Sequence, residues 1–196
     1  MTRLPVLVLL ILALALPTSA PATAQVDATA APVLAAKGKP SRAKWVKDVR
    51  KVLRGSGVVI RDRIAAAEEG EKLAINFDID NTAIASAYDG DGPVERTLKL
   101  ARMAAKRGVF LVFNTGRLNR GRTRALSQLE RAGYDVTMLC MRKKGERLAH
   151  SKKRCRSFFA RKGLTLIANL GNNPTDFAGD GYEVAYRLPN YGGRLS

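Results

Sequence analysis

Residues 73–82 read Leu-Ala-Ile-Asn-Phe-Asp-Ile-Asp-Asn-Thr, a short apolar run that ends in two carboxylates. A run of this length with few polar side chains is typical of a strand buried on both faces of a parallel sheet. Asp78 and Asp80 then follow the carboxyl end of that strand, the edge at which parallel sheets bind their ligands. The stretch therefore predicts both a central strand and the position of a polar site.

Helical and strand patterns alternate on both sides of this strand. Apolar residues recur at helical spacing from Trp45, with Ser41 as N-cap, and predict a helix to about Glu69 with an interruption at 55–57. The elements expected after the strand are a helix that begins with Pro93 at its first position and ends at Gly108, a strand over 109–113, a helix over 119–132, a strand over 136–140, a helix over 151–162, a strand over 164–168 and a strand near 182–187. This alternation predicts an α/β fold, a parallel sheet covered by helices on both faces.

The N-terminus has the pattern of an export signal. Arg3 precedes an apolar run over 6–16, and the small residues Ala-Thr-Ala follow at 22–24. We expect residues 1–24 to be a cleaved signal peptide and the protein to be secreted, or at least extracytoplasmic. The apolar run is shorter than the roughly 20 residues that span a bilayer, and an uncleaved membrane anchor is the alternative.

The rest of the chain is expected to form one domain. Residues 25–40 are rich in Ala, Pro and Thr and predict a flexible spacer, which leaves 41–196 as the folded part. The formal net charge of the chain is +17, an excess that attracts phosphorylated ligands without specifying a fold. Aromatic residues make up only 6% of the sequence and are not interleaved with the charges, which argues against sequence-specific nucleic-acid recognition.

The chain has two cysteines and one histidine. In an exported protein Cys140 and Cys155 can form a disulfide, but two free buried thiols fit the sequence equally well. A zinc site is not indicated, because His150 has no companion at metal-ligand spacing.

Basic residues crowd the stretch 142–156, where Glu146 is the only acid. They are Arg142, Lys143, Lys144, Arg147, Lys152, Lys153, Arg154 and Arg156. A solvated basic face is one interpretation, and a groove that attracts phosphorylated polymers is the other.

Polar residues recur wherever a predicted strand ends or a helix begins. Asp78 and Asp80 follow the first strand, Thr115 the second, Lys152 opens a helix, and the stretch 169–176 follows the fourth strand. Each alone is a common turn or capping device. Together, in this order and on one rim of the sheet, they indicate a site.

These motifs resemble those of a known family. Phe-Asp-Ile-Asp-Asn-Thr at 77–82, Thr-Gly-Arg at 115–117, the Lys152 and Arg156 pair, and Gly-Asn-Asn-Pro-Thr-Asp at 171–176 resemble the four motifs of the haloacid-dehalogenase (HAD) superfamily. The likeness is greatest to its secreted acid phosphatases, the branch that includes plant vegetative storage proteins, and runs from about Trp45 to Tyr191. It implies a Rossmann-like three-layer core and a magnesium-dependent phosphomonoesterase. Only residues 83–108 separate the first two motifs, so the inserted cap usual in the family is expected to be reduced to a loop and one helix, a minimal cap.

The resemblance also implies roles for particular residues. Asp78 would attack phosphorus to form an aspartyl-phosphate, and Asp80 would serve as general acid and base. The groups that would hold the phosphoryl oxygens are the Thr115 side chain, the Lys152 ammonium and the backbone amides of Ile79 and Gly116. Expected partners are phosphorylated small molecules or phosphorylated polymers; the sequence gives no indication of the oligomeric state.

The expected cofactor is Mg²⁺, and one of its ligands departs from the family pattern. Asp78, the main-chain carbonyl of Asp80 and the side chain of Asn172 would hold the ion, with Asp176 in support or as a replacement ligand. The family has aspartate where this chain has Asn172, so one negative charge is lost and weak activity is expected. The alternative is a catalytically impaired relative with an anion-binding or structural role.

Overall fold

The computed structural model describes residues 38–195. The expected signal peptide, residues 1–24, and all but the end of the expected spacer, residues 25–40, lie outside the described residues. Within residues 38–195, no helix has both the length and the apolar character that a bilayer-spanning segment needs.

The segment before the first helix packs on the domain. The Lys39 ammonium donates to the Ala87 carbonyl, and the Tyr88 hydroxyl donates to the Pro40 carbonyl at 2.9 Å. The last residues of the expected spacer therefore contact the folded part instead of standing clear of it.

The predicted N-terminal helix is two helices, α1 (Arg42–Val52) and α2 (Ser56–Ala65). The Ser41 side chain accepts a hydrogen bond from the Lys44 amide at 3.3 Å, which confirms the predicted N-cap. Gly55 has a left-handed φ of 76°, and this explains the break between the helices, since glycine adopts that conformation without strain.

The sheet has five strands, all parallel, in the order β3-β2-β1-β4-β5. The strands are β1 (Lys72–Phe77), β2 (Phe110–Leu118), β3 (Met138–Arg142), β4 (Leu164–Gly171) and β5 (Val184–Arg187). The predicted parallel α/β fold is confirmed, with β1 in the centre.

Three predicted strands end too early, and one of them is the strand predicted over 136–140, which is β3 and ends at Arg142. β2 continues past Phe113 because Asn114 and Thr115 still pair with Cys140 and Met141 on β3, and the register becomes irregular only after Thr115. These polar side chains are buried, so pairing with a neighbouring strand satisfies their backbone groups. β4 likewise runs on to Gly171, which brings the fourth motif directly to the edge of the sheet.

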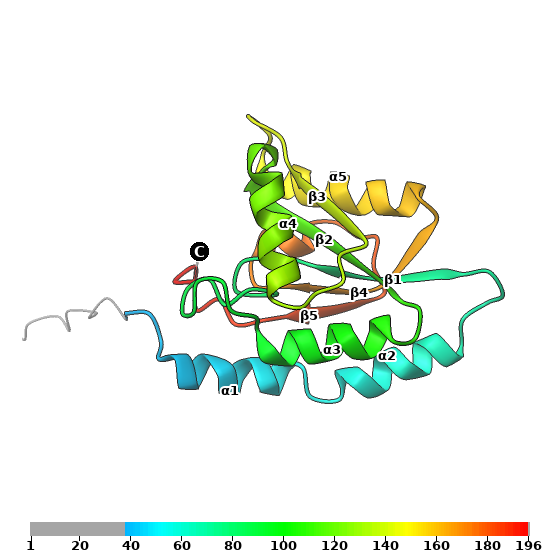
Figure 1. The fold of residues 1–196 in the computed structure, drawn as a ribbon, viewed down its shortest axis with the longest axis horizontal. Coiled ribbons are helices and arrows are strands. Elements are labelled where there is room, and N and C mark those ends of the chain that lie inside the picture. Colours follow the sequence, from blue (N-terminus) through cyan, green and yellow to red (C-terminus); the bar gives the residue numbers. More distant parts are fainter. Residues whose placement is uncertain (1–37, 196) are drawn as a thin grey trace, which may run out of the picture. The chain divides into compact units, whose positions relative to one another are not determined.

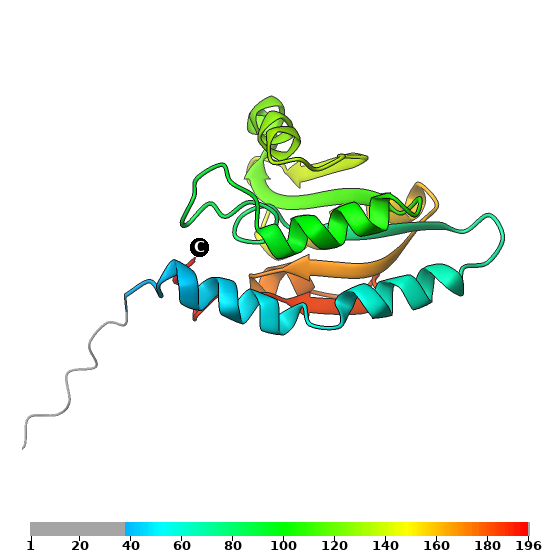
Figure 2. The same cartoon turned by 60° about the horizontal axis from the view of Figure 1, so that its bottom comes forward.

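Helices cover both faces of the sheet, as Figures 1 and 2 show. One face packs against α1, α2, α3 (Glu95–Ala105) and α4 (Arg122–Arg131) in the larger core, which includes Ile75 and Phe113. The other packs against α5 (Leu148–Arg161) in a smaller core built on Ala74, Val112 and Phe159. Alternate residues of β1 and β2 thus enter different cores, as the pleat of a buried strand requires.

The helix expected to begin at Pro93 begins at Glu95. The structure contradicts the placement of Pro93 at the first helical position, because residue 93 forms an isolated antiparallel bridge with Ile84. α3 buries Leu98 and Ala101 in the larger core and is therefore part of the helical layer. The segment between the first two motifs accordingly adds no helical cap over the site.

Candidate active site

The register of the sheet brings three motifs together. Phe77 at the end of β1 lies beside Phe113 of β2 and Leu170 of β4. The residues that follow these positions, among them Asp78, therefore meet at one carboxyl edge. The convergence expected from the sequence is what this register produces.

Lys152 joins the carboxylates of this edge. Its ammonium lies 2.5 Å from Asp78 Oδ1 and 2.6 Å from Asp176 Oδ1, and it donates to the Asn114 carbonyl at 2.6 Å. The Asn114 amide in turn donates to the Lys152 carbonyl at 2.8 Å. Lys152 lies in the second turn of α5 and not at its start, because the helix begins three residues earlier than expected, at Leu148.

Burial and charge act against each other on these groups. Burial alone would lower the pKa of Lys152, but the charges of Asp78 and Asp176 outweigh it and raise that pKa, so the ammonium keeps its proton. Burial raises the pKa of Asp78; the Lys152 charge opposes this shift and the Asp176 charge adds to it. When all three are ionised, two carboxylates share one ammonium and one negative charge is left over.

Asp80 lies beside Arg117. The guanidinium donates to the two Asp80 carboxylate oxygens at 2.8 and 2.6 Å, and to Gln128 Oε1 at 2.5 Å. Burial would raise the pKa of Asp80, but the hydrogen bonds and charge of Arg117, with smaller contributions from Ser86 and Lys152, lower it overall. Asp80 is therefore held in its charged form and in a fixed orientation.

The groups expected to hold phosphoryl oxygens lie at this edge, but not all of them form its surface. Gly116 and Lys152 line a pocket of about 520 Å³ together with Asp78 and Asp80. Thr115 and Ile79 are fully buried beneath it, and Thr115 Oγ1 accepts a hydrogen bond from the Arg117 amide at 3.2 Å. The roles of the Thr115 hydroxyl and of the two backbone amides stay predictions.

The fourth motif forms a short 3₁₀ turn, η2 (Pro174–Phe177), directly after β4. Asp176 Oδ2 accepts a hydrogen bond from the Asn173 amide at 2.8 Å, and Oδ1 contacts Lys152. A side chain on Gly171 would put a Cβ 2.5 Å from the Asp176 Cβ, so the motif needs glycine at this position. Asp176 is thus engaged in supporting contacts, and both Asp176 and Asn172 line the pocket.

Arg156 holds the turn that carries Asp176, a role the sequence did not assign to it. Its buried guanidinium donates to the main-chain carbonyls of Asp176 and Asp180 at 2.9 Å, and also to that of Ala178. It also lies over the Tyr182 ring. The sequence signal was the spacing of Lys152 and Arg156, which puts both on one face of a helix.

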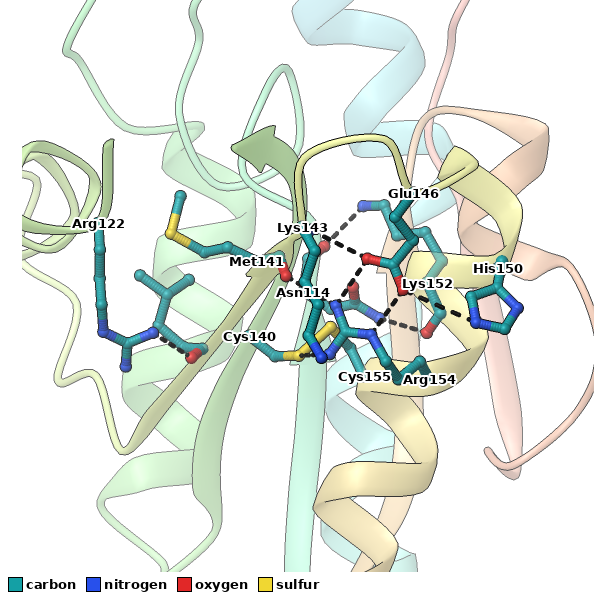
Figure 3. The surroundings of a disulfide bond; sticks show 11 residues. Asn114, Arg122, Cys140, Met141, Lys143, Glu146, His150, Lys152, Arg154 and Cys155 are labelled. Atoms are coloured by element: carbon teal, nitrogen blue, oxygen red, sulfur yellow. Dashed lines mark hydrogen bonds and ion pairs between the residues drawn. A yellow bond between two sulfur atoms is a disulfide. The ribbon is translucent and has the colours of Figure 1, made fainter. Parts of the chain in front are cut away.

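A disulfide ties α5 to the sheet. Cys140 of β3 and Cys155 of α5 are bonded, with a Cα–Cα distance of 5.6 Å, which resolves the alternative the sequence left open. Figure 3 shows the bond beneath Lys152 and beside Arg154. Since Cys155 is less than one helical turn from Lys152, the disulfide helps to fix the position of Lys152 at the site.

The basic stretch 142–156 is not one uniform surface. Lys152 and Arg156 are buried, and Arg154 forms an ion pair with Glu146 at 2.6 Å (Figure 3). His150 is exposed near the same glutamate. The members left on the surface without an ion pair, within the described chain, are Lys143, Lys144, Arg147 and Lys153.

The donor set at the edge fits a hard divalent cation. Asp78 supplies a carboxylate, Asn172 an amide oxygen and Asp80 a main-chain carbonyl, and Mg²⁺ prefers oxygen ligands. The surplus negative charge beside Lys152 also favours a cation. No trio of acidic, histidine or cysteine side chains suited to a metal gathers in residues 38–195, so these oxygens and water would have to complete the coordination.

A family model described as HAD superfamily, subfamily IIIB (Acid phosphatase) matches residues 86–194, more than half of the chain. The chain is also similar to a class C acid phosphatase from Bacillus anthracis, solved with tungstate bound, with a TM-score of 0.58 and 15% identity over 78% of this chain and 80% of that one. At this identity the structural likeness shows the fold alone. No curated protein matches the chain.

Proposed function

Because the chain belongs to the HAD superfamily, subfamily IIIB, and is a phosphatase of the acid phosphatase type, we propose that it hydrolyses phosphomonoesters through an aspartyl-phosphate on Asp78, with Mg²⁺ as cofactor. The observation that carries the proposal is the buried Lys152 ammonium, 2.5 Å from the Asp78 carboxylate. A phosphate ester repels an anionic nucleophile, and a fixed cation beside that nucleophile reduces the repulsion.

Two displacements complete the reaction. In the first, an Asp78 oxygen bonds to phosphorus while the bond from phosphorus to the ester oxygen breaks, and Asp80 gives its proton to that oxygen. In the second, water attacks phosphorus, Asp80 takes a proton from the water, and the bond from Asp78 to phosphorus breaks. The products are an alcohol and inorganic phosphate, and both carboxyl groups return to their starting forms.

Asp80 and Lys152 have different tasks in this scheme. Lys152 keeps its charge throughout and orients Asp78 and Asp176. Asp80 must gain a proton before the first displacement, and its lowered pKa makes that form most abundant in acid solution. Mg²⁺, when held by Asp78, the Asp80 carbonyl and Asn172, supplies positive charge toward the phosphoryl oxygens.

Export from the cytoplasm is part of the proposal. It is supported by the signal-like N-terminal pattern and by the disulfide between Cys140 and Cys155, since such bonds persist in oxidising compartments. N-terminal sequencing of the mature protein from fractionated cells tests it, and retention of residue 1 in a cytoplasmic fraction contradicts it.

Hydrolysis of p-nitrophenyl phosphate tests the proposed chemistry. We expect activity with Mg²⁺, loss of activity with EDTA, and no activity in an Asp78→Asn variant that circular dichroism shows to be folded. If wild type and variant are equally inert, the alternative stands: an impaired relative that binds anions or serves a structural role. Asn172 favours that alternative, because an amide ligand binds the cation less strongly than a carboxylate.

A further inference from the structure

A second hollow adjoins the pocket at the carboxyl edge. It also encloses about 520 Å³, and it shares Ser86 and Arg117 with the first pocket. Arg117 donates to Asp80 on one side and to Gln128, another lining residue of the second hollow, on the other. The Asp80 and Arg117 pair therefore lies where the two hollows meet.

The proposed role of Asp80 indicates which part of the substrate would contact the second hollow. If Asp80 protonates the leaving oxygen, as the proposed function states, the alcohol part of the substrate must begin beside Asp80. Asp80 itself lines the first pocket, and Arg117, which holds its carboxylate, lines both that pocket and the second hollow. The inference that follows rests on the proposed function for this step.

The lining of the second hollow is cationic. Arg120, in the turn η1 (Asn119–Gly121), and Arg124, in the first turn of α4, are both exposed. Neither forms an ion pair in residues 38–195. The one acid of the lining, Asp91, is already bound by Gln128 and lies 3.2 Å from Arg131.

The composition of the hollow excludes an aromatic stacking platform, since none of its lining residues is aromatic. Two guanidinium groups that lack carboxylate partners are instead suited to a phosphate, which accepts hydrogen bonds from arginine in a bidentate manner. A second phosphate on the alcohol would meet Arg120 and Arg124 while the first lies beside Asp78.

We propose that Arg120 and Arg124 form a leaving-group subsite, and that the preferred substrates are phosphomonoesters whose alcohol carries a second phosphate. The alcohol then links two anionic groups, one at the reacting carboxylate and one in the second hollow. Part of the excess positive charge of the chain would then bind the second phosphate of the substrate, next to the site.

A matched series of esters tests the subsite. The values of kcat/KM are measured for linear alkanediol monophosphates and for the bisphosphates of the same diols, from three to six carbons. Because a bisphosphate has two equivalent phosphate esters that can be hydrolysed, statistics alone raise its kcat/KM only twofold over that of the monophosphate. We expect the best bisphosphate to exceed its monophosphate by at least tenfold, and the advantage to fall at high salt, which screens exposed charges.

Variants assign the effect to the second hollow. In an Arg120→Gln/Arg124→Gln double variant, we expect the ratio of the two kcat/KM values to fall toward two. The control is Arg50→Gln/Arg54→Gln, which removes the same charge from α1 and the turn after it, outside both hollows, and should keep the wild-type ratio. Binding of the bisphosphate to an Asp78→Asn variant is measured as well, so that the ratio does not depend on turnover alone.

Each result decides something. A wild-type ratio near two in an active enzyme overturns the subsite and leaves the proposed function intact, whereas hydrolysis of neither ester overturns both. A ratio that survives in the arginine variant but is lost in Lys39→Gln would place the second phosphate on the segment before α1, and would also overturn the proposal.

Discussion

Replacing Lys152 with methionine is expected to destabilise the metal-free protein by about 3–5 kcal/mol at neutral pH, because two buried carboxylates lose their shared partner. The side chain of Lys152 is 3% exposed, and those of Asp78 and Asp176 are 9% and 3% exposed, so water cannot take the place of the ammonium. Methionine has nearly the same length and is apolar, which keeps the cavity small. For a domain of this size the melting temperature should fall by roughly 6–20 °C.

The pH dependence of this variant has a definite sign. Burial already raises the pKa of Asp78 above its unfolded value, and Lys152 opposes that shift. Without the ammonium the pKa rises further, so the ionised carboxylate costs stability at high pH and the cost disappears as the pH falls through the raised pKa. The difference in unfolding free energy between variant and wild type should therefore be smaller at about pH 5 than at about pH 8.

Denaturant unfolding of metal-free protein, followed by circular dichroism at both pH values, measures these differences. Lys153→Met is the matched control, because its neighbouring side chain is exposed. The double variant Lys152→Met/Asp176→Asn should recover part of the stability, since it removes one of the stranded charges. Equal unfolding free energies for Lys152→Met and wild type, or a loss that is the same at both pH values, would refute the reasoning.

Three further changes test separate parts of the site. Arg117→Gln should raise the pKa of Asp80, because the hydrogen bonds and charge of Arg117 lower it, so the limb on which activity falls with rising pH moves upward; an unmoved limb in a pH profile of kcat contradicts the pairing. Cys140→Ser/Cys155→Ser should lower the unfolding free energy by about 2–4 kcal/mol, the usual effect for a loop of this size, and reductant should change the melting temperature of the wild type alone. Asn172→Asp should lower the Mg²⁺ concentration needed for half-maximal activity, by about tenfold if the added charge contributes roughly 1.4 kcal/mol, and an unchanged concentration removes Asn172 from the ligand set.

The sequence predicted the fold through patterns that act over short distances. The apolar run at 73–77 and the alternation around it were enough to identify a parallel sheet. The strand ends were harder to predict, because Asn114 and Thr115 are polar residues that pair inside the sheet. Pro93 was misplaced for a related reason: its fixed φ suits a bridge beside Ile84 as well as a helix start.

The sequence motifs also identified the residues of the site, but they did not predict which side chains pair with one another. Four motifs on one rim predicted that Asp78 and Lys152 would be close. The pairing of Asp80 with Arg117 was not predicted, because the motifs indicate which residues share the rim but not which of their side chains bond once β1 and β2 are in register. For the same reason the cluster at 142–156 looked like one surface, although its members divide between the interior and solvent.

The arrangement around α5 explains how a site without a helical cap can keep its charges in place. Cys155 fixes the helix to β3, Asn114 is bonded to both ends of Lys152, and Arg156 grips the turn that carries Asp176. All of these contacts join α5 to the sheet or to the turn after β4, so they need no closing domain. Electrostatic catalysis depends on charges that are oriented before the substrate arrives, and here the scaffold supplies that orientation. These contacts do not cover the side of the site where the leaving group would lie, and there Arg117 lines both the reacting pocket and the second hollow. The choice of substrate should therefore depend more on the residues of the second hollow than on the residues that carry out the reaction.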